Sequence, residues 1–332
     1  MKIAITGVAG FLGSHIADRL IRNGHDVIGN DNLIGGAFSN VPVGVKFSPV
    51  DCLDMEGMTK KIQGVDVVYH CAATPHEGLS VFSPDLVTRN IFGASVSVIT
   101  AAIRAGVKRF IFCSSMARYG AQTPPFTEDM VPRPVDPYGI AKVASEDVLR
   151  ALAVQHGMEF VILVPHNIIG PRQKYDDPYR NVAAIMINRM LRGEQPIVYG
   201  DGSQVRCFSY VDDVVDPMVC CLDASVSGEI INIGPDQGEV TILELAKTLA
   251  DILEFNLDPV HLLDRPLEVK HANCSADKAR RLLGYEPKVP LRLGLQFMSE
   301  YIRKTGPKAF TYHLPLEIVN DKTPKSWREH LI

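Results

Sequence analysis

Apolar and polar positions alternate in blocks along the first half of the chain. Short apolar runs predict strands at 2–6, 24–31, 45–47, 65–71, 109–113 and 160–164. Longer stretches with apolar residues on one face predict helices at 14–22, 90–105 and 138–156. Nearly continuous apolar strands between helices are typical of a parallel sheet covered on both faces. The pattern therefore predicts a doubly wound α/β fold.

The pattern changes after residue 165, where elements become shorter and Gly and Pro more frequent. We interpret 1–165 as the domain that holds the parallel sheet, with a return of the chain to the sheet near 205–235. Residues 166–303 then form a smaller α/β domain. The tail, 304–332, shows little periodicity, and the sequence assigns it no role.

Composition narrows the class of protein. The chain has 332 residues, 46% of them hydrophobic, and a net charge of −4, so no global basic field points to nucleic acid. No apolar run reaches membrane-spanning length by inspection of the sequence, and the N-terminus begins at once with a strand, so we expect a cytoplasmic protein without a membrane partner. The seven cysteines show no metal-binding spacing, nor do the histidines, and no metal site is expected.

A glycine motif follows the first predicted strand. Gly7, Gly10 and Gly13 stand between that strand and a helix, and Asp31 ends the next strand 18 residues after Gly13. Glycines permit a tight turn close to a pyrophosphate, and the helix N-terminus offers free N–H groups. A carboxylate at Asp31 binds ribose hydroxyls and repels a 2′-phosphate. Such glycines also occur in ordinary turns, but this context predicts a dinucleotide site that prefers NAD to NADP.

A second motif pairs Tyr138 with Lys142, four residues apart on one predicted helix face. A neighbouring ammonium lowers the pKa of a phenol from about 10, which makes a general base. Ser115 follows the strand at 109–113, at the edge where ligands bind in such sheets, and its hydroxyl suits a substrate hydroxyl. Taken alone, the pair fits an exposed helix face and the serine fits a cap.

Together these motifs resemble the extended short-chain dehydrogenases/reductases of the nucleotide-sugar epimerase/dehydratase family, from Met1 to about residue 303. The resemblance rests on the segments 7–13, 31–33, 114–120, 138–142 and 167–172, and on Arg206, Arg265 and Pro266. It implies a Rossmann-type sheet with a C-terminal substrate-binding domain, and a catalytic triad of Ser115, Tyr138 and Lys142.

The resemblance also implies the ligands. NAD would be held by Gly7, Gly10, Phe11, Leu12, Gly13, Asp31, Asn32, Asp51, Cys52, Ala72, Tyr138, Lys142 and Pro165. A nucleotide sugar, most simply UDP-linked, would be held by Ser115, Asn167, Arg206, Arg265, Glu268 and Ala272. Within this set the arginines match the diphosphate and Glu268 the ribose. Ala272 replaces a tyrosine of some epimerases and predicts space for a 2-acetamido group.

The reaction is indicated by the residues after the catalytic serine. Dehydratases of the family usually carry Asp-Glu there and decarboxylases a Glu at the second position, whereas this chain has Met116 and Ala117. Neither side chain moves a proton, which favours an NAD-dependent 4-epimerase acting through a 4-keto sugar, in polysaccharide biosynthesis. A dehydratase, decarboxylase or reductase is the alternative, and a non-catalytic NAD sensor a remote one.

Several features stay open at this stage. Uronate, hexose and 2-acetamido sugars all remain possible, because Pro75, Arg118 and Pro165 depart from the family's usual residues. The resemblance further implies a homodimer, in which the helices at 90–105 and 138–156 would form a four-helix interface with a second copy.

Overall fold

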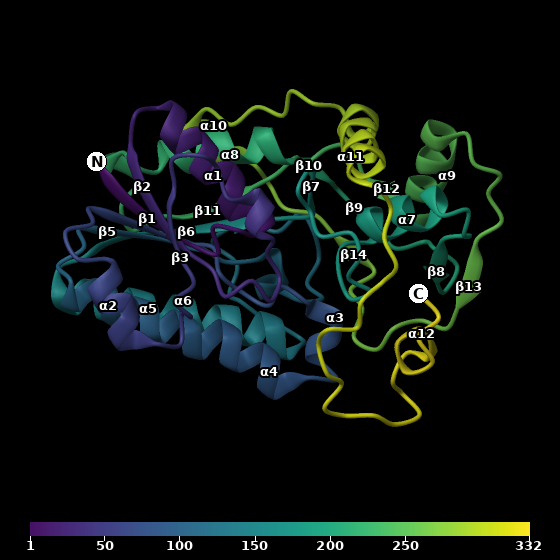
Figure 1. The fold of residues 1–332 in the computed structure, drawn as a ribbon, viewed down its shortest axis with the longest axis horizontal. Coiled ribbons are helices and arrows are strands. Elements are labelled where there is room, and N and C mark those ends of the chain that lie inside the picture. Colours follow the sequence, from purple (N-terminus) through teal and green to yellow (C-terminus); the bar gives the residue numbers. More distant parts are fainter.

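A seven-stranded parallel sheet forms the centre of the larger part of the molecule (Figure 1). The computed structural model describes residues 1–332, apart from the side chain of Ala224. In spatial order the strands are β11 (Ile230–Ile233), β6 (Glu159–Pro165), β5 (Arg109–Cys113), β4 (Val67–His70), β1 (Lys2–Thr6), β2 (Asp26–Asn30) and β3 (Lys46–Ser48). All neighbours pair in parallel, which confirms the predicted doubly wound α/β fold.

Helices cover both faces of this sheet because its strands are apolar on both sides. Ile3 and Ile5 of β1 belong to the hydrophobic cluster on one face, and Ala4 belongs to the cluster on the other. The helices α1 (Phe11–Arg22), α8 (Val211–Cys220) and α10 (Asp277–Leu283) lie above the sheet in Figure 1, and α2 (Met55–Lys61), α5 (Ala94–Arg104) and α6 (Pro137–His156) lie below it.

One helix differs from its prediction. Instead of starting near residue 90, it runs from Pro84 to Arg104 through α4 (Pro84–Thr88), a π-helical turn at Arg89–Gly93, and α5. Pro84 stands in the first turn, where its fixed φ favours helix initiation. By length and composition this helix could cross a membrane, so the expectation that no apolar segment is long enough was wrong. A core helix passes the same test, and this one packs against α2 and α6.

The smaller part of the molecule has its own hydrophobic cluster, on the right of Figure 1. Its helices are α7 (Val182–Leu191), α9 (Ile242–Leu253) and α11 (Leu291–Thr305). Its short strands pair as β7 (Ile168–Ile169) with β10 (Ser209–Tyr210), β8 (Ile197–Tyr199) with β13 (Val260–Leu262), and β9 (Val205–Arg206) with both β12 (Val240–Thr241) and β14 (His271–Ala272). Single turns of 3₁₀ helix stand at Phe38–Asn40, Met116–Tyr119 and Ala224–Val226.

The tail after α11 returns across the molecule to the first part. It carries α12 (Lys325–Arg328) and ends near β8 and β13 in Figure 1. Its backbone N–H at Thr311 donates to Asp176, and the Glu317 carboxylate accepts from the N–H groups of Asp85 and Leu86 at the start of α4. Trp327 is 2% exposed and packs on aromatic rings from both parts. The tail therefore ties the two parts together.

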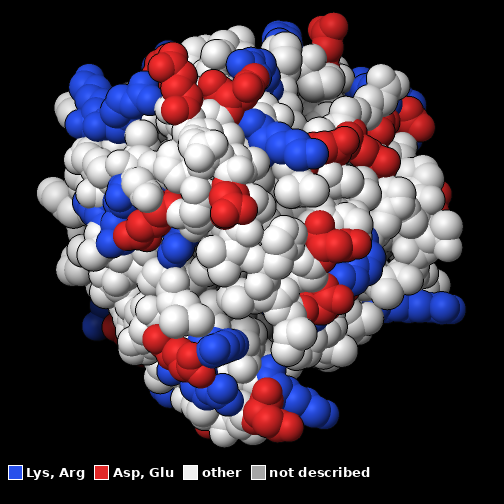
Figure 2. Space-filling view, turned by 90° about the vertical axis from the view of Figure 1, so that its right-hand side faces the viewer, with Lys and Arg blue, Asp and Glu red and all other residues white. Residues whose placement is uncertain are grey.

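Figure 2 looks onto the smaller part of the molecule. Acidic and basic side chains alternate across this face rather than gathering by sign. This mixed surface agrees with the small net charge of −4.

Candidate active site

A cavity of about 480 Å³ lies at the carboxyl edge of the parallel sheet, between the two parts of the molecule. Loops that follow β1, β2, β4, β5 and β6 form one wall, and segments of the smaller part and of the tail form the other. This is the place where ligands bind in open α/β sheets. All but one of the residues predicted to hold NAD or substrate line this cavity; the exception is Ala272.

The glycine turn between β1 and α1 is built for a close backbone approach. Gly7 has a φ of +72°, and a Cβ there would lie 2.9 Å from the backbone of Ala72. A Cβ at Gly13 would lie 2.3 Å from the carbonyl oxygen of Gly7. Helix α1 begins after Gly10 without any side-chain cap, so its first N–H groups are free to face the cavity. The turn fits the pyrophosphate of a dinucleotide.

Asp31 is held at the rim of the same wall. Its carboxylate accepts hydrogen bonds from the backbone N–H groups of Ala9, at 3.0 Å, and Leu33, at 2.8 Å. Burial raises the pKa of Asp31, and these hydrogen bonds oppose that rise. Asn32 donates to Asp51 at 2.7 Å, which brings the predicted adenosine residues together. These residues fit the adenosine half of NAD.

The predicted catalytic pair stands at the start of α6. Asp136 caps this helix by accepting from the N–H of Gly139 at 2.9 Å, and places Tyr138 and Lys142 on one face toward the cavity. The ammonium of Lys142 donates to the carbonyl of Cys113 at 2.7 Å and lies 6.0 Å from the centre of the Tyr138 ring. Burial lowers the pKa of Lys142 to about 8.

Burial and the neighbouring Ser115 shift the pKa of the Tyr138 phenol in opposite directions. Burial raises the pKa of Tyr138 above its usual range, and a hydrogen bond with the Ser115 side chain lowers it. Ser115 also accepts from the N–H of Ala117 at 3.2 Å. The three residues of the predicted triad thus meet at one end of the cavity.

A buried ion pair lies behind this centre. Glu146 stands four residues after Lys142 on α6, and its carboxylate lies 3.0 Å from the guanidinium of Arg118. It also accepts from the hydroxyl of Ser114. Burial raises the pKa of Glu146 and the charge of Arg118 opposes that rise. Arg118, which departs from the family's usual small residue, is therefore an internal partner of the catalytic helix.

The predicted diphosphate residues line the opposite end. Arg206 donates to the carbonyls of Val205, at 2.8 Å, and Val269, at 2.6 Å. Arg265 donates to Glu268, and its guanidinium lies over the ring of Tyr199, 4.8 Å from the ring centre. The Asn167 amide donates to the carbonyl of Cys207 at 3.0 Å.

Ala272 lies outside this arrangement. It is 3% exposed, stands in β14 beside Arg206, and packs in the hydrophobic cluster below the sheet. Among the residues that the structure describes, it is absent from the cavity wall. Sequence position alone does not show which way a side chain of a two-residue strand points, and this buried alanine does not provide space for a 2-acetamido group.

Glu77, Asp136 and Arg180 line the cavity and were not identified from the sequence. Glu77 opens the short helix α3 (Glu77–Ser80), in the loop after β4. Burial within the protein raises the pKa of the Glu77 carboxyl to about 7, with Asp136 adding to the rise. Its position just after a parallel strand is the sequence signal that could have found it, since Ser115 was selected by the same rule.

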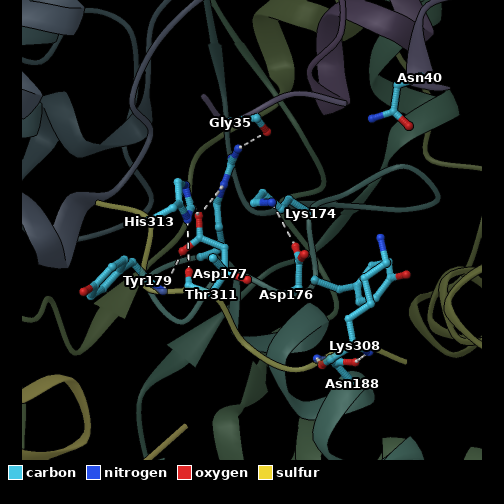
Figure 3. A network of polar contacts seen from close by, with 12 residues as sticks. Gly35, Asn40, Lys174, Asp176, Asp177, Tyr179, Asn188, Lys308, Thr311 and His313 are labelled. Atoms are coloured by element: carbon cyan, nitrogen blue, oxygen red, sulfur yellow. Dashed lines mark hydrogen bonds and ion pairs between the residues drawn. The ribbon is translucent and has the colours of Figure 1, made fainter. Parts of the chain in front are cut away.

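A polar network joins three segments of the cavity wall (Figure 3). Asp177 is fully buried and accepts from the Tyr179 N–H at 2.9 Å. The His76 ring lies 2.9 Å from the same carboxylate. His313 of the tail lies 3.7 Å away. Burial acts to raise the pKa of Asp177, but the hydrogen bond with His76 and the charge of Arg180 lower it to about 2. Asp177 therefore anchors the loop after β4, the loop before α7 and the tail.

Comparison with known proteins gives consistent results. Residues 3–234 match the model of the NAD dependent epimerase/dehydratase family. The chain is 32% identical over 323 residues to a UDP-N-acetyl-alpha-D-glucosaminuronate decarboxylase from Bacillus cytotoxicus, covering 91% of this chain and 98% of the relative. It is also 32% identical over 316 residues to a UDP-glucose 4-epimerase from Mycolicibacterium smegmatis, covering 91% and 99%.

Solved structures give the same picture. A UDP-glucose 4-epimerase from Thermotoga maritima with UDP-glucose has a TM-score of 0.86 and 37% identity, covering 92% of this chain and 99% of its own. A UDP-glucuronic acid 4-epimerase from Bacillus cereus, in complex with UDP-glucuronic acid and NAD, has a TM-score of 0.86 and 30% identity, covering 92% and 100%. These proteins match over nearly their whole length, and the uncovered share of this chain corresponds in length to residues 306–332.

Proposed function

The chain belongs to the NAD-dependent epimerase/dehydratase family, and we propose that it interconverts the C4 epimers of a UDP-linked sugar, with NAD as its cofactor. One observation carries the choice of reaction. Tyr138, Lys142 and Ser115 meet in the cavity, while the two residues after Ser115 are Met116 and Ala117, which hold no ionisable group. This set is sufficient for reversible oxidation of one hydroxyl group. Met116 and Ala117 add no further acid or base beside Ser115.

The residues act on the 4-hydroxyl group. Tyr138 takes the hydroxyl proton as general base and returns it after the sugar has turned over. The charge of Lys142 favours the phenolate form, and Ser115 hydrogen-bonds the reacting oxygen. NAD, held at the glycine turn and Asp31, would supply the reversible hydride acceptor for C4. Arg206 and Arg265 hold the diphosphate meanwhile, because guanidinium groups match phosphate oxygens.

A lyase reaction on the same nucleotide sugars is the second candidate, because a decarboxylase is among the relatives. It requires a proton donor for the carbon that loses CO₂. Met116 and Ala117 cannot supply that proton, which is why we favour the epimerase.

We also propose that the enzyme is cytoplasmic, serves polysaccharide biosynthesis and forms a homodimer through α5 and α6. Phe92, in the π-helical turn that leads into α5, and Ile140 and Val154 of α6 are 37–77% exposed, and a symmetric partner would cover them. Light scattering at micromolar concentration should give twice the chain mass of 36.5 kDa. A mass of one chain would contradict the dimer.

Incubation with a panel of UDP-sugars, without added reductant, tests the reaction. UDP-glucose, UDP-N-acetylglucosamine and UDP-glucuronate are each followed by chromatography and mass spectrometry. An isomer of unchanged mass is expected. Loss of water or CO₂ would select the lyase, and no change in any sugar would refute both reactions.

A further inference from the structure

Glu77 is the one carboxylate in the cavity that has no partner. Five carboxylates line this space. Asp31 and Asp51 accept from backbone N–H groups, Asp136 caps α6, and Glu268 binds Arg265. Among the residues that the structure describes, none forms a hydrogen bond or ion pair with the Glu77 carboxylate, although Ser80 binds its backbone carbonyl. The Glu77 side chain is exposed in the cavity, so its carboxylate is free to accept a hydrogen bond from a ligand bound there.

Its location points to the donor. Glu77 lies close enough to Arg206 and Arg265 for their charges to act on its carboxyl group, and its own charge acts on the Tyr138 phenol. In the proposed reaction the sugar spans this same interval, with C4 at Tyr138 and C1 toward the arginines. Glu77 therefore flanks the hexose ring rather than the nucleotide.

The backbone holds Glu77 in this position from both sides. His76 is bound to buried Asp177 at 2.9 Å. On the other side, a Cβ at Gly78 would lie 3.3 Å from the indole of Trp327 and 3.6 Å from the guanidinium of Arg265. Because both neighbours are packed, the backbone of Glu77 is held at the cavity wall.

Part of this support comes from the tail. Trp327 packs against Gly78, and His313 lies 3.7 Å from Asp177, as Figure 3 shows for the network around Asp177. Relatives that match over 98–100% of their own length leave a share of this chain uncovered that equals the tail in length. Through Trp327 beside Gly78, and through His313 at the Asp177 that binds His76, the tail reaches both sequence neighbours of Glu77.

Three cations of the cavity already bind groups of the protein. Lys142 donates to the carbonyl of Cys113, and Arg265 binds Glu268. Arg180 lies 3.7 Å from Asp177 and donates to the carbonyl of Gly35. A second carboxylate next to Glu77 would bring two like charges together, whereas a hydroxyl group would donate a charge-assisted hydrogen bond.

We propose that Glu77, held in place by the C-terminal tail, selects the sugar: it accepts a hydrogen bond from a hydroxyl group of a neutral hexose and excludes a hexuronate. The proposal rests on the proposed function, because it places the sugar of a UDP-sugar between Tyr138 and the arginines.

The test compares UDP-glucose with UDP-glucuronate, which differ only at C6. Glu77→Gln keeps the size of the side chain and removes the charge, and Glu56→Gln, a surface carboxylate paired with Arg104, is the matched control. The wild-type holoenzyme should prefer UDP-glucose by kcat/KM. In Glu77→Gln the value for UDP-glucose should fall by about 10- to 100-fold, the span of a hydrogen bond to a charged group, and the value for UDP-glucuronate should rise. The control should leave both unchanged.

Calorimetry supplies a readout that does not need turnover. Glu77→Gln should weaken binding of UDP-glucose, strengthen binding of UDP-glucuronate and leave UDP alone unchanged. If both sugars turn over but their ratio is the same in wild type and Glu77→Gln, the inference is overturned while the proposed function stands. If the sugars bind with the expected ratio but are not epimerised, the proposed function fails and the selection by Glu77 stands. If neither sugar binds, both fail.

A second variant addresses the tail. Trp327→Phe shortens the ring that packs on Gly78, and should reduce the preference for UDP-glucose by less than Glu77→Gln does, with unchanged NAD content. An unchanged preference in Trp327→Phe would remove the tail from the proposal.

Discussion

The two halves of the cavity are built in different ways. The phosphate and ribose part of the NAD half is built from neighbours in sequence: the glycine turn, the N-terminus of α1 and Asp31 lie within or directly after the first strand–helix–strand unit. The sugar half collects Glu77, Arg206, Arg265 and His313 from segments spread over more than 200 residues of the chain. A half made of consecutive residues depends on local backbone geometry, whereas a half made of distant segments depends on how two cores and a tail pack.

This difference predicts how each half responds to change. In the NAD half a single Cβ can disturb the binding turn without any change in packing. In the sugar half the backbone carbonyls around Arg206 and the ring of Trp327 determine where the charges stand. Variants of each half should therefore separate binding of NAD from binding of the sugar nucleotide.

The largest effect is expected where the two halves meet. Tyr138→Phe removes the only phenol at the reacting hydroxyl, and turnover should fall by about 10²–10⁴-fold, the usual contribution of general acid–base catalysis. NAD content and UDP affinity should match those of the wild type, since the aromatic ring is kept. Near-normal turnover in the folded variant would exclude Tyr138 as the base.

The next effect concerns the NAD half alone. Gly13→Ala places a Cβ 2.3 Å from the Gly7 carbonyl oxygen, so the turn has to open. NAD affinity measured by calorimetry should fall by about 100-fold, equivalent to about 2.7 kcal/mol. UDP affinity, which depends on the other half, should stay unchanged. A parallel loss of UDP affinity would show that the two halves are not independent.

A smaller effect is expected at Asp31. Asp31→Asn removes the charge that repels a 2′-phosphate but keeps an oxygen that can accept from the backbone. The ratio of the dissociation constant for NADP to that for NAD should fall by about 10-fold or more. Equal affinity of the wild type for the two cofactors would contradict the assignment of Asp31 to the ribose.

The smallest effect tests the surroundings of Glu77 without any ligand. The folded protein raises the pKa of this carboxyl to about 7 from its ordinary value of 4.5, chiefly by burial. Between these values the folded state binds the proton more readily than the unfolded state, so this group lowers the free energy of unfolding as the pH rises. Glu77→Gln does not titrate, and should therefore melt roughly 1–3 °C above wild type at pH 8 and level with it near pH 5.

Glu56→Gln provides the control for this melting experiment. The hydrogen bond with Arg104 lowers the pKa of Glu56. Removing the charge of Glu56 should therefore not stabilise the protein at pH 8. A pH-independent difference between Glu77→Gln and wild type would show that the Glu77 carboxyl does not titrate in this range.

Much of the fold could be predicted from the sequence because it depends on local patterns. The strand at 109–113 coincides with β5, and the helix expected at 138–156 is α6 with one more residue at its start. The start of the long helix at Pro84 was missed, because the polar residues Asp85, Thr88 and Arg89 interrupt the apolar run. Their helical conformation follows from the proline at the start and from the tail, whose Glu317 binds the first N–H groups.

The sequence by itself determined which chemistry the cavity contains, since parallel strands carry the residues that follow them to one common edge. By that rule Gly7, Asp31 and Ser115 could be assigned together without a structure. Only the tertiary structure decided that Ala272 points into the core, that Glu77 lines the cavity, and that the tail reaches back to pack beside it. Short strands and aperiodic segments carry no pattern of their own, and their side chains take their direction from the packing of distant parts of the chain.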